Sequence, residues 1–279
     1  MKSLKSKLTI ALLAITVVSF SFFSCQKQAK EIETKNNSSV INPKNYASMT
    51  STQFITLSED EINSIGVMHN ELLDKILTDF DYSALTSSNM FDLARTAFIN
   101  TEYKSSTTDF KTQTFDQTYS WLNQGVITGN VLNYMNLIQT ELESGKHFSE
   151  VSDYLNSLKQ TVSNNSDLTD FEKQTIKIGI SVARNSAEYW FPIEYGGNGK
   201  GHAHMNRLSQ HFGQGDVPPM KAISKGGKIA GADLAGACVG GIEWCGTAIF
   251  GGPVGVGAFI GGCLYSAVAG SLLSWGGIG

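Results

Sequence analysis

Charge is nearly absent from the last fifty-one residues of the chain, 229–279. Only Asp233 and Glu243 are charged there, and no Lys or Arg follows Lys228. The same stretch holds fifteen of the 28 glycines, whereas residues 1–195 hold five. This change separates a body of ordinary globular composition from a small-residue, apolar tail suited to close helix packing or to lipid.

Proline is also scarce, with none between Tyr46 and Phe191. Proline interrupts helices, and this stretch shows no alternation of apolar and polar residues that would indicate strands. We therefore expect an all-α helical bundle. Basic residues are spread rather than clustered and the net charge is -4, which excludes the electrostatic footprint of a nucleic-acid-binding protein.

Familiar catalytic motifs are missing. The chain has no G-x-S-x-G, no P-loop, no dinucleotide-binding fingerprint and no H-E-x-x-H. Neighbouring carboxylates, such as Glu59 and Asp60, are typical of solvent-exposed helix ends. His69 lies on the apolar face of a helix, where a hydrogen-bonded core histidine is expected. We predict a protein without enzymatic activity or cofactor.

Three histidines, His202, His204 and His211, lie in a Gly/His-rich stretch with Glu194 and Asp216 nearby. Imidazoles and carboxylates are ligands of zinc and similar metals. Their spacing matches no metal motif, and a tight site requires rigid support that glycine-rich sequence does not offer. We predict that these histidines form no tight metal site; a metal-dependent enzyme at this stretch is the weakest alternative.

The N-terminus has the pattern of a targeting signal. Three lysines occur within the first seven residues, residues 8–23 are apolar, and Ser24 and Cys25 precede a polar stretch. The apolar run is shorter than the ~20 residues of a spanning helix. The segment resembles a bacterial lipoprotein signal, as in Bacteroidota. The resemblance implies removal of residues 1–24, a lipid on Cys25 and an outer-membrane location on the periplasmic or surface face of the cell envelope. An uncleaved anchor and a plain secretory signal are the alternatives.

The sequence divides into five segments. Residues after Cys25 offer little apolar surface and predict a disordered tether. Capping boxes at Ser58/Glu61 and Thr169/Glu172 begin two of six expected helices. Another of the six ends near Gly145. The predicted segments are 1–24 (signal peptide), 25–56 (lipidated Cys and tether), 57–191 (helical bundle), 192–219 (Gly/His-rich connector) and 220–279 (Gly-rich apolar helical hairpin).

The tail is expected to be a glycine-zipper helical hairpin. Pro253 divides it into two arms, 229–250 and 254–275, each of which is long enough to cross a ~30 Å hydrocarbon core if helical. Glycines at small-xxx-small spacing let helix backbones approach closely, and tryptophans suit a membrane interface. The candidate packing or membrane-contact residues are Gly236, Gly240, Gly257, Gly261, Trp244 and Trp275.

Four stretches of the tail, 225–231, 236–241, 251–255 and 261–262, resemble class II bacteriocins, especially the two-peptide type, in their basic start and Gly/Ala-rich arms. The resemblance implies a membrane-interacting or pore-forming segment, with membrane lipid as partner. The favoured interpretation is a lipid-anchored envelope protein with such a segment. The alternative is a non-toxic interaction or scaffold lipoprotein whose tail packs on its own bundle, or joins it to another copy or another envelope protein.

Three cysteines, Cys238, Cys245 and Cys263, lie in the tail. Cys238 and Cys245 are seven residues apart, ~10 Å along a helix, too far to bridge each other. In an antiparallel hairpin Cys263 lies opposite a point between them. We therefore predict one disulfide from Cys263 to either cysteine; small apolar packing residues are the alternative.

Overall fold

The computed structural model describes residues 55–86, 88–101, 111–112, 116, 129–243 and 252–275, all of which belong to one compact unit, Asn42–Gly279. Within these ranges the chain forms eight α-helices and no strand. The prediction of an all-α fold is therefore confirmed. The predicted signal peptide, lipidated Cys25 and tether, together with Trp244 and Cys245, lie outside the described residues.

The helices are α2 (Glu59–Thr78), α3 (Met90–Asn100), α5 (Gly129–Leu142), α6 (Phe148–Asn164), α7 (Asp170–Trp190), α8 (Lys200–His211), α9 (Pro219–Glu243) and α10 (Gly252–Trp275). Two short 3-10 turns, Tyr82–Ala84 and Ile193–Tyr195, precede α3 and α8. Among the described residues, none of these helices combines the length and the apolar character needed to cross a membrane.

Side-chain caps explain where two of the helices begin. Ser58 accepts a hydrogen bond from the Glu61 N–H, and the Glu61 carboxylate accepts one from the Ser58 N–H at 2.7 Å. Thr169 and Glu172 repeat this arrangement at the start of α7. Both predicted capping boxes are confirmed, because reciprocal bonds satisfy backbone donors that the first helical turn leaves free.

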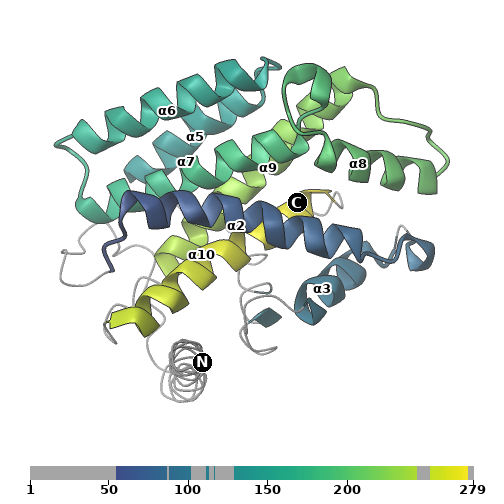
Figure 1. Cartoon of the computed structure of the whole chain (residues 1–279), viewed down its shortest axis with the longest axis horizontal. Coiled ribbons are helices and arrows are strands. Elements are labelled where there is room, and N and C mark those ends of the chain that lie inside the picture. The colour runs from purple at the N-terminus through teal and green to yellow at the C-terminus, as the bar shows by residue number, and fades with distance from the viewer. Residues whose placement is uncertain are drawn as a thin grey trace, which may run out of the picture. The chain divides into compact units, whose positions relative to one another are not determined.

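The two glycine-rich helices pack against each other and run past α2 and α7 (Figure 1). α9 contacts α10, α7 and α5, and α10 also contacts α2 and α3. α6 packs on the outside, against α7 and α5. α10 is apolar around its whole circumference, which is typical of a helix enclosed on all sides. The tail is therefore the centre of the domain rather than an appendage of it.

Glycines bring the backbones of α9 and α10 into contact. A Cβ atom at three of these glycines would lie 2.2 to 2.6 Å from a backbone oxygen of the facing helix, closer than real Cβ atoms approach. Residue numbers rise along one helix as they fall along the other, so the helices are antiparallel. The pairs are Gly236 with Ser266, Gly240 with Gly262, and Gly270 with Ala232.

These contacts match the prediction in part. Gly236 and Gly240 lie at the contact, but α10 contributes Gly262 and Gly270 to it, and Gly261 is partly exposed. Residues 244–251, which connect the two helices, lie outside the described residues, so the turn of the hairpin stays a prediction.

Within the predicted connector, residues 192–219, the chain forms a helix that the sequence did not indicate, α8. Buried Met205 and Leu208 give this helix an apolar face. Gly201 adds to that face, because a Cβ there would lie 2.4 Å from the Trp190 ring. The glycine and histidine residues of α8 have low helix propensity, so the sequence alone did not indicate a helix that tertiary packing stabilises.

Candidate functional site

A carboxyl group lies in the centre of this apolar core. Asp233, on α9, is fully buried, although no other charged residue lies between Lys228 and Glu243. Three polar side chains from three other helices surround it: His69 from α2, Ser186 from α7 and Ser271 from α10, each also fully buried. We call these four residues the Asp233 cluster.

Short hydrogen bonds hold the Asp233 cluster together. Ser186 Oγ lies against Asp233 Oδ2, and Ser271 Oγ lies against Asp233 Oδ1. The His69 Nε2 atom is 3.3 Å from Ser271 Oγ and 3.5 Å from Asp233 Oδ2. The carboxyl group thus contacts α7 and α10 directly and α2 through the serine.

Asn70 determines which nitrogen of the His69 ring carries a hydrogen. The Asn70 amide donates to the Asn185 carbonyl at 2.7 Å, so its Oδ1 atom faces His69 Nδ1 at 3.0 Å. An amide oxygen only accepts hydrogen bonds, so Nδ1 is the protonated nitrogen. In a neutral imidazole, Nε2 must then accept, and the hydroxyl of Ser271 is its donor.

Burial favours the neutral forms of both ionisable groups. Loss of solvation raises the pKa of Asp233 to about 8, although the serine hydroxyls and the Trp190 indole partly oppose this shift. Loss of solvation also lowers the pKa of His69 to about 4, although the hydrogen bond that His69 donates to Asn70 opposes this shift. At neutral pH an uncharged carboxylic acid therefore faces an uncharged imidazole.

The neutral forms satisfy the cluster through one directional chain. The Asp233 carboxylic acid donates to Ser271, Ser271 donates to His69 Nε2, and His69 Nδ1 donates to Asn70. Ser186 donates to the remaining carboxyl oxygen of Asp233. Each polar atom has a partner, which a buried polar network needs in order to stabilise rather than weaken a core.

The Asp233 cluster contains the residue types of a serine hydrolase but not their arrangement. In such a triad, histidine lies between serine and carboxylate. Here Ser271 lies between His69 and Asp233, and Asn70 occupies the second ring nitrogen. With every member fully buried, no substrate reaches the serine. The cluster positions four helices and does not perform nucleophilic chemistry.

Each of the three histidines of the predicted connector forms a hydrogen bond with a different part of the chain. His202 Nε2 donates to the Val217 carbonyl and His211 Nε2 to the Leu85 carbonyl, both at 2.8 Å. His204 Nδ1 lies 3.1 Å from the Tyr82 hydroxyl. Nowhere in the described ranges do three or more His, Cys, Asp or Glu residues gather as they would around a metal ion.

The predicted disulfide is wrong for one of its two pairings. Cys238 is a free and fully buried thiol, with its Sγ atom 3.9 Å from the Thr175 carbonyl. Burial raises the pKa of Cys238 to about 12, so this thiol packs as a small apolar residue. The Cys245–Cys263 pairing stays a prediction, since Cys245 lies outside the described residues.

Sequence reasoning placed His69 correctly in the core but missed its partner. The signal for Asp233 was present: it is one of only two carboxylates, with Glu243, in a long apolar, glycine-rich run, where an unpaired charge is costly. What the sequence did not reveal is that two serines and a histidine from distant helices meet it.

The chain matches no protein-family model, no curated protein and no solved structure.

Proposed function

We propose that this chain is a lipid-anchored cell-envelope protein whose glycine-rich helices form the permanent core of an interaction or scaffold domain. In this proposal the lipid on Cys25 supplies the attachment to the membrane. The folded domain then presents its surface to partners in the envelope, with no catalytic step.

The Asp233 cluster is the observation that carries this proposal. Its hydrogen bonds are satisfied only when α2, α7, α9 and α10 pack together as they do here. Withdrawing α9 and α10 from the bundle would separate Asp233 from Ser186 and His69, and an unpaired buried polar group costs about 1–3 kcal/mol. The cluster therefore supports a core position for the two glycine-rich helices.

A membrane-interacting role for α9 and α10 is the second candidate. It is favoured by α10, which carries no charged residue, and by the neutral state of Asp233 below pH 8. A helix pair without charge enters lipid at a far lower cost than a charged one. In this candidate the pair leaves the bundle at the membrane, as the resemblance to class II bacteriocins implies.

Vesicles distinguish the two candidates. The full-length lipidated protein is added to dye-loaded anionic vesicles, and hydrogen exchange is followed in residues 229–243 and 259–275. A permanent core predicts slow exchange of both segments on the vesicles and no dye release. Fast exchange together with dye release would favour the membrane-interacting candidate.

Two variants of the protein provide a second test that separates the two candidate functions. Asp233→Ala removes the centre of the cluster, and Asp153→Ala, at an exposed position of α6, serves as its control. A permanent core predicts a less stable Asp233→Ala protein that still releases no dye. If the pair acts on membranes, weakening its attachment to the bundle should instead speed dye release relative to Asp153→Ala.

A further inference from the structure

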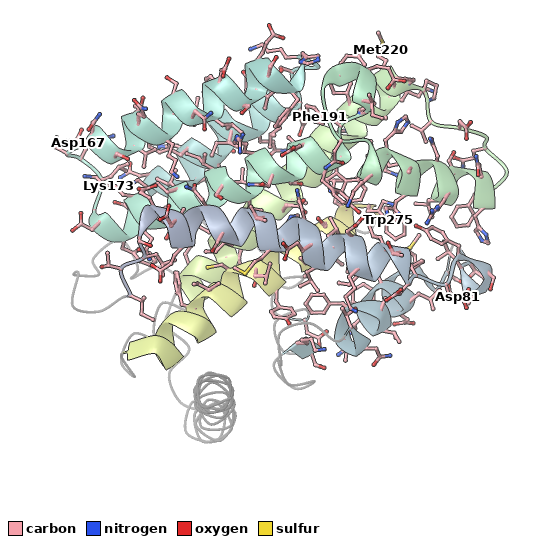
Figure 2. All side chains as sticks on the ribbon, in the orientation of Figure 1. Asp81, Asp167, Lys173, Phe191, Met220 and Trp275 are labelled. Carbon is pink, nitrogen blue, oxygen red and sulfur yellow. The ribbon has the colours of Figure 1, made fainter. Side chains whose placement is uncertain are left out.

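A cavity of about 530 Å³ opens where α8, the start of α9 and the end of α10 meet. This volume falls within the range of small-molecule binding sites. Figure 2 labels Trp275 at the C-terminal end of α10, where its side chain forms part of the cavity wall. The cavity is separate from the Asp233 cluster, none of whose residues lines it.

Most of the wall is apolar. Met90, Met205, Leu208 and Trp275 contribute buried surface, and Val217 is partly buried. Phe212 also lines the cavity and leaves 40% of its side chain exposed. An open cavity with such walls suits an apolar chain that enters from solvent or from a lipid surface.

Lysine side chains give this cavity positive charge. Lys225 lines the cavity; it is partly buried and makes no ion pair or hydrogen bond with the described residues. Burial lowers the pKa of Lys225, as expected for an ammonium group without a counter-ion. Lys221, one helical turn earlier, adds a second positive charge.

One acidic residue, Asp216, also lines the cavity, but among the described residues it forms no ion pair with Lys221 or Lys225. Asp216 is exposed, and its Oδ1 atom accepts a hydrogen bond from Gln210 Nε2 at 2.5 Å. A second cavity, between α2 and α3, differs in this respect: Asp79 and Asp81 line it beside a single lysine, Lys75. The first cavity thus combines positive charge with apolar walls.

We propose that the cavity between α8, α9 and α10 binds an amphiphilic anion, with its acyl chain against the apolar side chains and its acidic head on Lys225. A carboxylate or phosphate head supplies the counter-ion that Lys225 lacks among the described residues. A free fatty acid and an anionic phospholipid share this chemistry.

Photo-crosslinking tests the proposal on the full-length protein in nanodiscs of zwitterionic phospholipid. A diazirine-labelled palmitic acid is compared with the equally long, uncharged alcohol and with a diazirine-labelled phosphatidylglycerol. Tandem mass spectrometry locates the label. We expect labelling of α8 and of the end of α10 by the acid, by the phospholipid or by both; which of them labels identifies the source. The alcohol should label at least tenfold less.

Matched lysine variants test the head-group contact. Lys225→Met should reduce the apparent affinity for the anionic probe at least tenfold, whereas Lys228→Met, at an exposed position of the same helix, should leave it unchanged. Circular dichroism confirms that both variants fold. Equal labelling by acid and alcohol, label spread over the whole surface, or equal affinities of the two variants would overturn the proposal. This proposal rests on the proposed core position of α9 and α10, which line the cavity. Dye release reports failure of the core role, and site-specific labelling without dye release reports on the cavity alone.

Discussion

Replacing Asp233 by asparagine should cost little stability at pH 6.5 and should remove a pH dependence from the protein. Asparagine has the shape of a protonated aspartic acid: its oxygen accepts from Ser186, and its amide donates to Ser271. Because Asp233 is neutral in the folded protein, we expect the free energy of unfolding at pH 6.5 to change by no more than about 1 kcal/mol, the size of one net hydrogen bond.

The pH dependence follows from proton linkage. The folded-state pKa of Asp233 is raised to about 8 from a usual value of 3.8, so between these values the folded protein keeps a proton that the unfolded chain has released. Stability therefore falls as pH rises through this window. Below pH 6.5, His69 and His204 act in the opposite direction, because burial lowers the pKa of each to about 4.

At pH 6.5 both histidines are still half protonated in the unfolded chain, and their opposite contribution fades as pH rises further. This contribution is the same in Asp233→Asn, so the difference between the two proteins isolates Asp233. At about 1.4 kcal/mol per pH unit, the wild-type protein should lose about 2 kcal/mol relative to Asp233→Asn between pH 6.5 and 8. Urea unfolding followed by circular dichroism at four pH values measures both curves.

The competing arrangement is an ion pair between a charged Asp233 and a charged His69, which also loses stability as pH rises above 6.5. The cost of Asp233→Asn at pH 6.5 separates the arrangements. An ion pair predicts that this substitution costs about 3–5 kcal/mol, since it leaves a buried imidazolium unpaired. A cost of that size would refute our protonation assignment.

Three further predictions concern the core and the N-terminus. Gly236→Ala should lower stability by about 3 kcal/mol, because its Cβ would lie 2.2 Å from the Ser266 carbonyl oxygen. The control Gly231→Ala should be tolerated, because its Cβ would face only the flexible Gln139 side chain at 3.4 Å. Thermal unfolding measures both effects. Intact mass and detergent partitioning should reveal a lipidated mature protein that starts at Cys25; a soluble form with a free Cys25 thiol would contradict the lipoprotein signal. Peptide mapping under thiol-blocking conditions should find a Cys245–Cys263 disulfide, and alkylation of all three tail cysteines would exclude it.

Local features of the sequence predicted the fold well. The capping boxes at Ser58 and Thr169 depend on residues three apart, so the sequence specifies them without reference to the rest of the chain. The apolar face that carries His69 was likewise visible in its helical spacing, and the structure confirms its burial. Such signals are local, and local signals survive in almost any packing arrangement.

Long-range features could not be predicted in the same way. Ser186, Ser271 and His69 are unremarkable in sequence, and only the packing of their helices makes them partners of Asp233. The α8 helix was missed because its stability comes from Met205, Leu208 and Gly201 against the core rather than from helix propensity. The lining of the amphiphile cavity likewise joins residues 90, 205, 225 and 275, which no sequence window contains.

The central position of α10 has a consequence for the order in which the protein acquires its structure. α10 is translated after all the helices that enclose it, and α2, which packs on it, precedes it by more than 170 residues. Until α10 leaves the ribosome, α2, α3 and α9 lack one of the helices against which they pack. Contacts this distant in sequence form slowly, because long loops must close before they contribute. The core of the domain is therefore completed only when the last of the described helices has been made.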